Sequence, residues 1–182
     1  MKKVIDLDNV VVKFAGDSGD GVQLSGMQFT NTTALMGEEV ATFPDYPAEI
    51  RAPQGTVGGV SGFQLHFGKN IHTPGDKCDV LVALNPAAIM ANIKMIKRGG
   101  TIIADIDTFS EKNLEKAGFE EDTLDKIKQD YKLIEAPISS MTQETLKDSG
   151  LDIKVIMKSK NMFALGIVYN LFGFPTKYSE DF

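Results

Sequence analysis

Three glycines and a serine form the stretch of the chain best suited to bind a ligand. Gly16, Ser18, Gly19 and Gly21 follow an apolar run at 10–14 and precede a segment with helical periodicity. Such a strand, turn and helix make the first half of a β-α-β unit, and the unpaired amide groups at the helix start attract anions. Glycine also lets a ligand approach the backbone closely. The turn is therefore a candidate phosphate cradle, with Ser18 as a further donor; the alternative is a tight turn in which glycine serves packing alone.

The spacing of these glycines fits neither standard nucleotide motif. A dinucleotide fingerprint reads G-x-G-x-x-G with an acidic residue about 20 positions later. Here the glycines stand at 16, 19 and 21, and no Gly-Lys-Ser/Thr of a P-loop is present. Asp17 and Asp20 also lie where an anion would approach. If the turn binds a phosphate, we expect backbone amides to hold it and both carboxylates to point away.

Other residues able to do chemistry are few. Cys78 is the only cysteine, and it precedes an apolar run, which favours a buried thiol over a nucleophile. One cysteine cannot supply the four thiolates of an ordinary iron–sulfur cluster, and the two histidines, His66 and His72, have no cluster of further ligands beside them. Asp105 and Asp107 end a predicted strand, where solvated or helix-capping roles are favoured over a metal site or general acid–base chemistry. We expect no catalytic residue and no metal site in this chain.

A proline-rich loop follows the second predicted strand, at the edge where open α/β sheets place ligands. It spans 44–55 and contains three prolines, which make it stiff. Tyr46, Glu49 and Arg51 give the loop an aromatic ring, an acid and a base. Two interpretations remain open: a surface loop with an internal Glu–Arg pair, or an interaction loop.

Composition indicates one globular domain. The chain has 182 residues, of which 42% are hydrophobic and 24% charged, as in ordinary globular proteins. Its net charge of −6 argues against nucleic-acid and anionic-membrane partners. Neither an apolar run long enough for a membrane span nor a signal-peptide pattern appears, so we expect a cytoplasmic protein.

Alternating strand and helix patterns predict a three-layer, Rossmann-like α/β/α domain with a mostly parallel sheet. We expect strands at 10–14, 39–43, 61–67, 79–84, 101–106 and 131–136, and helices at 22–36, 87–97, 141–149 and 160–172. Asn85 should cap the second helix, and the cations and glycines at 97–100 should end it. One or two charged helices are expected within 110–130, a connector at 137–140, and a strand or helix at 153–157.

The predicted domain covers 1–175, and 176–182 is expected to be a tail or the start of a linker. Three aromatic residues, Phe174, Tyr178 and Phe182, lie beyond the last predicted helix. A free terminus seldom needs three aromatic rings. We therefore expect a partner surface or a linker at this end.

The glycine turn resembles one that opens the gamma domain of 2-oxoacid:ferredoxin oxidoreductases. That family reads G-x-G-G-Q-G-V, and this chain reads Gly16-Asp-Ser18-Gly-Asp20-Gly-Val22, with Ser and Asp in place of Gly and Gln. Two further motifs occur in the family's order. Tyr46-Pro-Ala-Glu49-Ile-Arg51 is similar to its Tyr-x-x-Glu-x-Arg, here followed by Ala-Pro where the family has Gly-Gly, and Asn161-Met162 is similar to the Asn-Met of its C-terminal helix.

The resemblance implies a gamma domain, most similar to those fused to an alpha domain in chains of the 2-oxoglutarate type. In that family the complex oxidatively decarboxylates a 2-oxoacid, such as 2-oxoglutarate or pyruvate, to an acyl-CoA and reduces ferredoxin. It uses thiamine diphosphate, Mg²⁺, iron–sulfur clusters and coenzyme A, none of them held by the gamma domain alone. The implied partners are the alpha and beta parts of the complex.

We expect two groups of site residues, one that binds a cofactor and one that contacts a partner. Gly16, Ser18, Gly19 and Gly21 are the candidate cofactor-binding residues, on the coenzyme A side of the site. Tyr46, Glu49, Arg51 and Asn161 are the candidate partner contacts. Two rival functions remain, a free-standing nucleotide- or CoA-binding protein and a pure assembly module without a ligand. Stabilisation of the isolated chain by a ligand would distinguish them.

Overall fold

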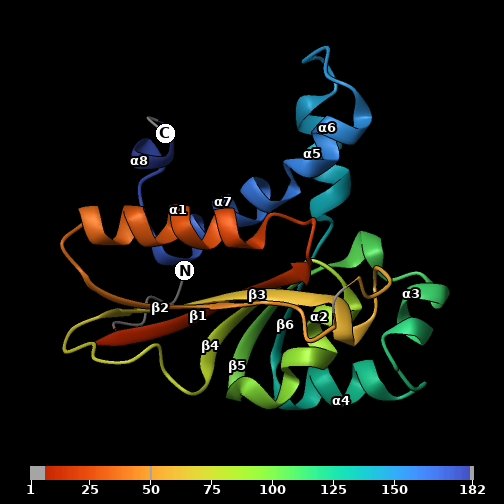
Figure 1. Ribbon diagram of the computed structural model, residues 1–182, viewed down its shortest axis with the longest axis horizontal. Coiled ribbons are helices and arrows are strands. Elements are labelled where there is room, and N and C mark those ends of the chain that lie inside the picture. The colour runs from red at the N-terminus through yellow and green to blue at the C-terminus, as the bar shows by residue number, and fades with distance from the viewer. Residues whose placement is uncertain (1–6, 50, 181–182) are drawn as a thin grey trace.

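The computed structural model describes residues 7–49 and 51–180 and is built around a six-stranded sheet (Figure 1). The strand order is β2-β3-β1-β4-β5-β6. β3 is antiparallel to both β1 and β2, whereas β1, β4, β5 and β6 run parallel. The mostly parallel α/β fold is therefore confirmed, with one reversed strand. The strands are β1 (Asn9–Asp17), β2 (Glu39–Asp45), β3 (Val60–Gly68), β4 (Cys78–Ala83), β5 (Ile96–Asp105) and β6 (Lys132–Ala136).

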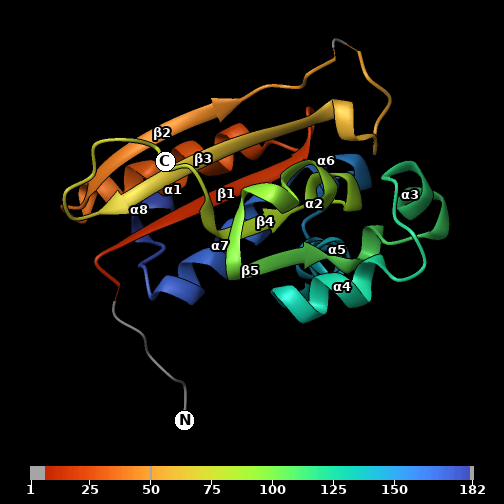
Figure 2. The same ribbon diagram turned by 90° about the horizontal axis from the view of Figure 1, so that it is seen from below.

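Helices lie on both sides of this sheet. α1 and α7 cover one face, and α2 and α4 lie on the other (Figures 1 and 2). Among the described residues, no helix is long and apolar enough to cross a bilayer. The helices are α1 (Val22–Leu35), α2 (Pro86–Asn92), α3 (Glu111–Lys116), α4 (Thr123–Asp130), α5 (Ile138–Leu146), α6 (Ile153–Lys158), α7 (Lys160–Phe172) and α8 (Lys177–Glu180), with short 3₁₀ turns η1 (Val57–Gly59), η2 (Ile93–Met95) and η3 (Ile106–Thr108).

The core consists of two apolar clusters, one on each face of the sheet. Strand side chains alternate between the faces, so Val12 and Phe14 of β1 pack in the cluster under α1 and α7. Val11 and Ala15 of the same strand pack in the cluster on the α2 and α4 side. Because β1 and β4 are central and buried on both faces, their near-continuous apolar runs are those expected of parallel strands.

The chain changes direction across the sheet between β1 and β4. After β1 it passes through α1 to β2 at one edge, whereas after β4 it passes through α2 to β5 on the other side. The loops that follow β1 and β4 therefore diverge at the carboxyl ends of two neighbouring strands. Open α/β sheets bind ligands at such a switch point. The glycine turn follows β1 here, and Asn85 follows β4.

The helix predicted at 87–97 is wrong at its C-terminal end. α2 stops at Asn92, and residues 97–100 belong to β5. Ile96 is 2% exposed and pairs with Cys78 of β4, so burying this side chain in the sheet prevails over extension of the helix. Gly99 has a φ of 74°, and the β4–β5 register shifts in this region. These glycines therefore serve an irregular strand, and Lys97 pairs with Asp79 instead of capping a helix.

The connector predicted at 137–140 is also wrong, because α5 begins at Ile138. Its first turn is stabilised by carboxylates from distant residues, which no local pattern reveals. The segment at 153–157, left open between strand and helix, is helical in α6.

Of the C-terminal aromatic residues, Phe174 is explained by packing within the domain and needs no partner. Phe174 packs on Phe29 and Phe67 at centroid distances of 5.6 and 5.7 Å, so its ring belongs to this domain's core. α8 follows and contacts α1, while Ser179 hydrogen-bonds Tyr169 at 2.6 Å. Tyr178 is half-buried, and Phe182 lies outside the described residues.

Candidate functional site

The glycine turn lies at the carboxyl end of β1 and leads directly into α1. Gly21 is the N-cap of α1, with φ 74° and ψ 22°, and no side chain caps the helix there. Most helices use a Ser, Thr, Asp or Asn side chain to satisfy one of the first amide groups. This helix start therefore leaves its first-turn amides without a side-chain cap, at the edge of the sheet where ligands bind.

The three glycines of the turn have different structural roles. A Cβ at Gly16 would lie 2.8 Å from Asp20 Oδ2 and 3.2 Å from Leu84 Cβ, and one at Gly21 would lie 2.4 Å from Asn161 Nδ2. Packing explains these two glycines. A Cβ at Gly19 would meet nothing within 4 Å, and Gly19 is exposed. The fold itself does not require glycine at this position.

Asp20 is turned into the protein by an ion pair. Its Oδ1 lies 2.8 Å from Lys160 Nζ at the start of α7, and the two side chains are 15% and 14% exposed. Its Oδ2 accepts a hydrogen bond from the Asp17 amide at 2.9 Å. The carboxylate expected to repel an anion is thus neutralised by Lys160. Sequence reasoning missed Lys160, because a single lysine far along the chain carries no signal of its partner.

Asp17 ties the glycine turn to the proline-rich loop. The Gly55 amide donates to both carboxylate oxygens of Asp17, at 3.1 Å each. Burial raises the pKa of this carboxyl, and the nearby Asp20 adds to the effect, while the Gly55 amide, Asn85 and Lys160 oppose it. Both aspartates of the turn therefore make contacts within the protein.

Asn85 and the two aspartates at the end of β5 cap helices at the same edge. Asn85 Oδ1 accepts from the Ala88 amide at 2.8 Å, which confirms the predicted cap. Asp105 is fully buried and accepts from the Ser139 amide at 3.2 Å and the Ser139 hydroxyl at 2.6 Å, while Asp107 accepts from the Ser140 amide at 2.6 Å. Helix capping is confirmed for both, whereas a solvated Asp105 is wrong. Burial raises the pKa of Asp105.

Three of the four candidate partner contacts are exposed on the loop after β2. Tyr46 is 70% exposed, Glu49 and Arg51 are exposed, and Arg51 has a φ of 62°. Asn161 is different, because it is buried at 4% exposure. Its Nδ2 donates to the Gly21 carbonyl at 3.1 Å and its Oδ1 accepts from the Met162 amide at 2.9 Å, so it clamps the glycine turn from α7.

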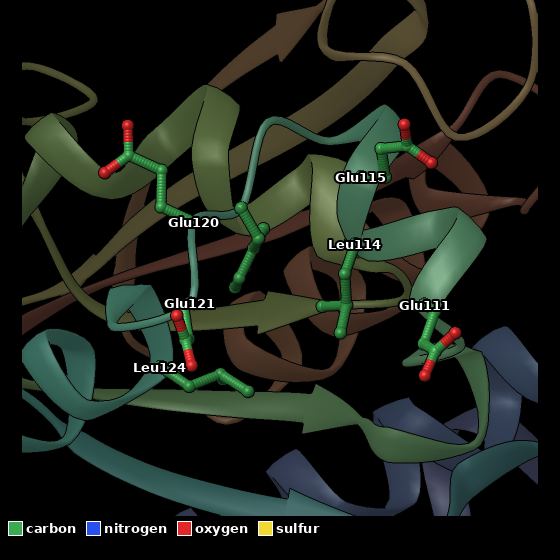
Figure 3. Close-up of a pocket in the computed structure, with 7 residues that line it drawn as sticks. Glu111, Leu114, Glu115, Glu120, Glu121 and Leu124 are labelled. Carbon is green, nitrogen blue, oxygen red and sulfur yellow. The ribbon is translucent and has the colours of Figure 1, made fainter.

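A separate hollow lies between α3 and α4 (Figure 3). Its volume is about 270 Å³, and the four glutamates that line it make it unsuited to an anion. No three His, Cys, Asp or Glu side chains lie together as a metal site anywhere in residues 7–49 and 51–180. The hollow is lined by Glu111, Leu114, Glu115, Phe119, Glu120, Glu121 and Leu124.

Residues 11–181 match the family model described as pyruvate ferredoxin/flavodoxin oxidoreductase. The chain belongs to this family. The 2-oxoglutarate oxidoreductase subunit KorA of Mycobacterium tuberculosis is 45% identical to it over 178 residues, which are 97% of this chain and 27% of that protein. The chain thus spans about a quarter of the length of the curated relative it matches.

Solved structures of the same oxidoreductase family share the fold. The 2-oxoglutarate:ferredoxin oxidoreductase of Magnetococcus marinus, solved with 2-oxoglutarate, coenzyme A and succinyl-CoA bound, has a TM-score of 0.70 at 27% identity, covering 95% of this chain and 26% of that one. The gamma subunit of a keto/oxoacid ferredoxin oxidoreductase from Geobacter sulfurreducens has a TM-score of 0.65 at 19% identity, covering 94% of this chain and 83% of that one. The second likeness is one of fold alone.

Proposed function

We propose that this chain is the gamma domain of a 2-oxoacid:ferredoxin oxidoreductase of the 2-oxoglutarate type. The observation that carries the proposal is the 45% identity to the Mycobacterium tuberculosis 2-oxoglutarate oxidoreductase subunit over nearly the whole chain. The Magnetococcus marinus structure, with 2-oxoglutarate among its ligands, supports the same substrate class. The reaction would convert the 2-oxoacid and coenzyme A to an acyl-CoA and CO₂, with two electrons passed to ferredoxin.

Within that enzyme, we assign the coenzyme A side of the site to the glycine turn. Two observations support this assignment. A Cβ at Gly19 would meet nothing within 4 Å, and the helix that follows starts without a side-chain cap. Backbone amides at such a helix start suit a phosphate of coenzyme A, and Ser18 is exposed beside them as a further donor. The Asp20–Lys160 pair reduces the repulsion that the turn's aspartates would otherwise exert.

The remaining cofactors of such an enzyme do not fit the side chains of this domain. The Mg²⁺ of thiamine diphosphate needs oxygen ligands, and no three His, Cys, Asp or Glu side chains lie together in the part of the chain that the structure describes. An iron–sulfur cluster needs several thiolates. Cys78 is the only thiol in the sequence, it is fully buried, and burial raises its pKa to about 11. We therefore assign these cofactors, and the contact with ferredoxin, to the alpha and beta parts of the enzyme.

The test is the activity of the assembled enzyme and of the isolated chain. Co-expression with the other polypeptides of the oxidoreductase should give a complex that reduces ferredoxin with 2-oxoglutarate and coenzyme A, and faster than with pyruvate. The isolated chain, supplied with thiamine diphosphate and Mg²⁺, should show no turnover. A complex inactive with every 2-oxoacid, or turnover by the isolated chain, would contradict the proposal.

A further inference from the structure

The helical layer formed by α1 and α7 carries no charge over most of its length. Residues 21–37 and 161–176 contain no Asp, Glu, Lys or Arg, although 24% of the whole chain is charged. The two helices lie side by side, since Ser25 Oγ donates to the Asn161 carbonyl at 3.1 Å and Thr32 hydrogen-bonds Tyr169 at 2.8 Å. They therefore form one continuous uncharged layer over the sheet (Figure 1).

The outer side of α1 exposes large apolar side chains in a regular row. Leu24, Met27 and Leu35 are 40%, 50% and 63% exposed, and exposed Asn31 lies between them. Their spacing of three, four and four residues places them on one helix face, opposite the buried residues Val22, Gly26, Phe29 and Thr33 that face the sheet. A surface helix usually presents charged or polar residues there. This helix instead has an apolar inner face and a largely apolar outer face.

The neighbouring face of α7 contains a glycine that the fold does not explain. Gly166 is exposed in the middle of the helix, and a Cβ there would meet nothing within 4 Å. Glycine in a helix interior costs about 1 kcal/mol relative to alanine. Because no contact within the described chain requires glycine, its absent side chain points to a surface that approaches α7 closely from outside.

Helix α4, on the other face of the sheet, has the composition of an ordinary solvent-exposed helix. On α4, Asp125, Lys126, Lys128 and Asp130 are charged, and the side chain of Lys126 is 63% exposed in a pair with Asp122. The same protein thus places ordinary charges along α4 and none within residues 21–37 and 161–176. The uncharged layer is therefore a local feature and does not follow from overall composition.

We infer that the outer face of α1 and α7 docks on another part of the same oxidoreductase, through an uncharged and mostly apolar surface of that part. This uncharged face comprises Leu24, Met27, Asn31 and Leu35 of α1 and Gly166 and Asn170 of α7, all of them exposed. The inference rests on the proposed function, under which the relatives' remaining length, about three quarters, belongs to the same enzyme. A charge placed opposite this face would lose hydration without gaining a counter-ion, so an uncharged surface is its complement.

Site-directed thiol labelling tests the inference. Cys78 is fully buried with a pKa of about 11, so it does not compete for a maleimide at neutral pH. We would make Met27→Cys and Gly166→Cys, with Lys126→Cys on α4 as the matched control, and follow the labelled peptides of this chain by mass. In the isolated chain all three thiols should react alike. In the assembled enzyme, labelling should slow by about tenfold or more at positions 27 and 166 and by less than about twofold at 126.

Each outcome bears on one claim. Unchanged labelling at positions 27 and 166 in an active complex would overturn the inference and leave the proposed function intact. A complex that forms but oxidises no 2-oxoacid would contradict the proposed function alone. If the isolated chain dimerises in a sedimentation experiment and positions 27 and 166 are then protected, the occupant is a second copy and the inference is wrong. If Gly166→Cys folds alone but does not assemble, protection of Met27→Cys decides the matter.

Discussion

Lys160 and Asp20 form an ion pair that joins the first residue of α7 to the glycine turn, 140 positions away along the chain, with Nζ and Oδ1 2.8 Å apart. The adjacent Asn161 donates to the Gly21 carbonyl, so two consecutive residues of α7 hold the turn. The turn's conformation therefore depends on the last long helix as well as on its own glycines. Because both charged side chains are mostly buried, the pair is screened less than a surface pair.

Removing Lys160 should destabilise the protein measurably. Lys160→Met leaves the Asp20 carboxylate mostly buried without its cation, and we expect the free energy of unfolding to fall by about 2 kcal/mol. The double variant Lys160→Met/Asp20→Asn should recover at least about half of this loss, as measured by urea denaturation. Lys147→Met provides the control, because the side chains of Lys147 and its partner Glu144 are 56% and 72% exposed, and its effect should stay within about 0.5 kcal/mol. Equal losses in the two lysine variants would show that the Asp20 pair is not structural.

Local sequence patterns were sufficient where a segment's structure depends on its own residues. The glycine turn, the Asn85 cap, the buried strands and α7 (Lys160–Phe172) follow from periodicity, turn chemistry and capping. The reversed direction of β3 is different. Alternation of Phe63, Leu65 and Phe67 shows a strand but says nothing of its direction, which is set by pairing with β1 and β2.

Long-range contacts account for what the sequence did not reveal. The start of α5 is stabilised by Asp105 and Asp107 from the end of β5, and Lys160 is recognised only once α7 is placed beside the turn. The glycines proposed for the candidate site stand out in the sequence because glycine spacing is a local signal. Which of those glycines the fold requires became clear only from their neighbours in space.

Stability should depend on pH through Asp105. Burial raises the pKa of this carboxyl above its ordinary 3.8, so the folded state holds the proton more tightly than the unfolded state does. Its contribution to stability is therefore complete below that ordinary value and is lost as pH rises through the folded-state pKa. Asp105→Asn removes this titration and keeps an oxygen to accept from the Ser139 amide. The free energy of unfolding of the variant, relative to wild type, should rise between about pH 4 and pH 7; a constant difference across that range would contradict the assignment.

Arg51 should matter to assembly more than to folding. The side chain is exposed, so Arg51→Ala should change the free energy of unfolding by no more than about 0.5 kcal/mol. If the loop after β2 contacts a partner, the same variant should weaken assembly by about tenfold or more, as the loss of an interface arginine commonly does. Thermal melting and sedimentation of the complex measure the two effects, with Lys126→Ala on α4 as a control that should change neither. A variant that unfolds, while its folded fraction assembles normally, would make Arg51 a structural residue.

Gly19 should matter to the binding of coenzyme A and not to folding. A Cβ added at this exposed position has no atom within 4 Å other than those of the adjoining residues. The Gly19→Val protein should therefore melt within a few degrees of wild type. If backbone amides of the turn bind a phosphate of coenzyme A, the valine side chain occupies the space the phosphate needs. Calorimetric titration of coenzyme A into the assembled enzyme should then show at least about hundredfold weaker binding, a loss of about 2.7 kcal/mol.

Asp20→Asn is the matched variant in the same turn. It keeps an oxygen to accept from the Asp17 amide, removes one negative charge and leaves the Lys160 ammonium without its carboxylate partner. Coenzyme A should therefore bind this variant as tightly as wild type or more tightly, because both changes favour an anion at the helix start. Dephospho-coenzyme A, which lacks the 3′-phosphate, is titrated in parallel to identify the phosphate that the turn binds. It should bind more weakly than coenzyme A only if the turn contacts the 3′-phosphate. If Gly19→Val binds coenzyme A normally with its fold intact, the glycine turn serves packing alone and the coenzyme contacts another part of the enzyme.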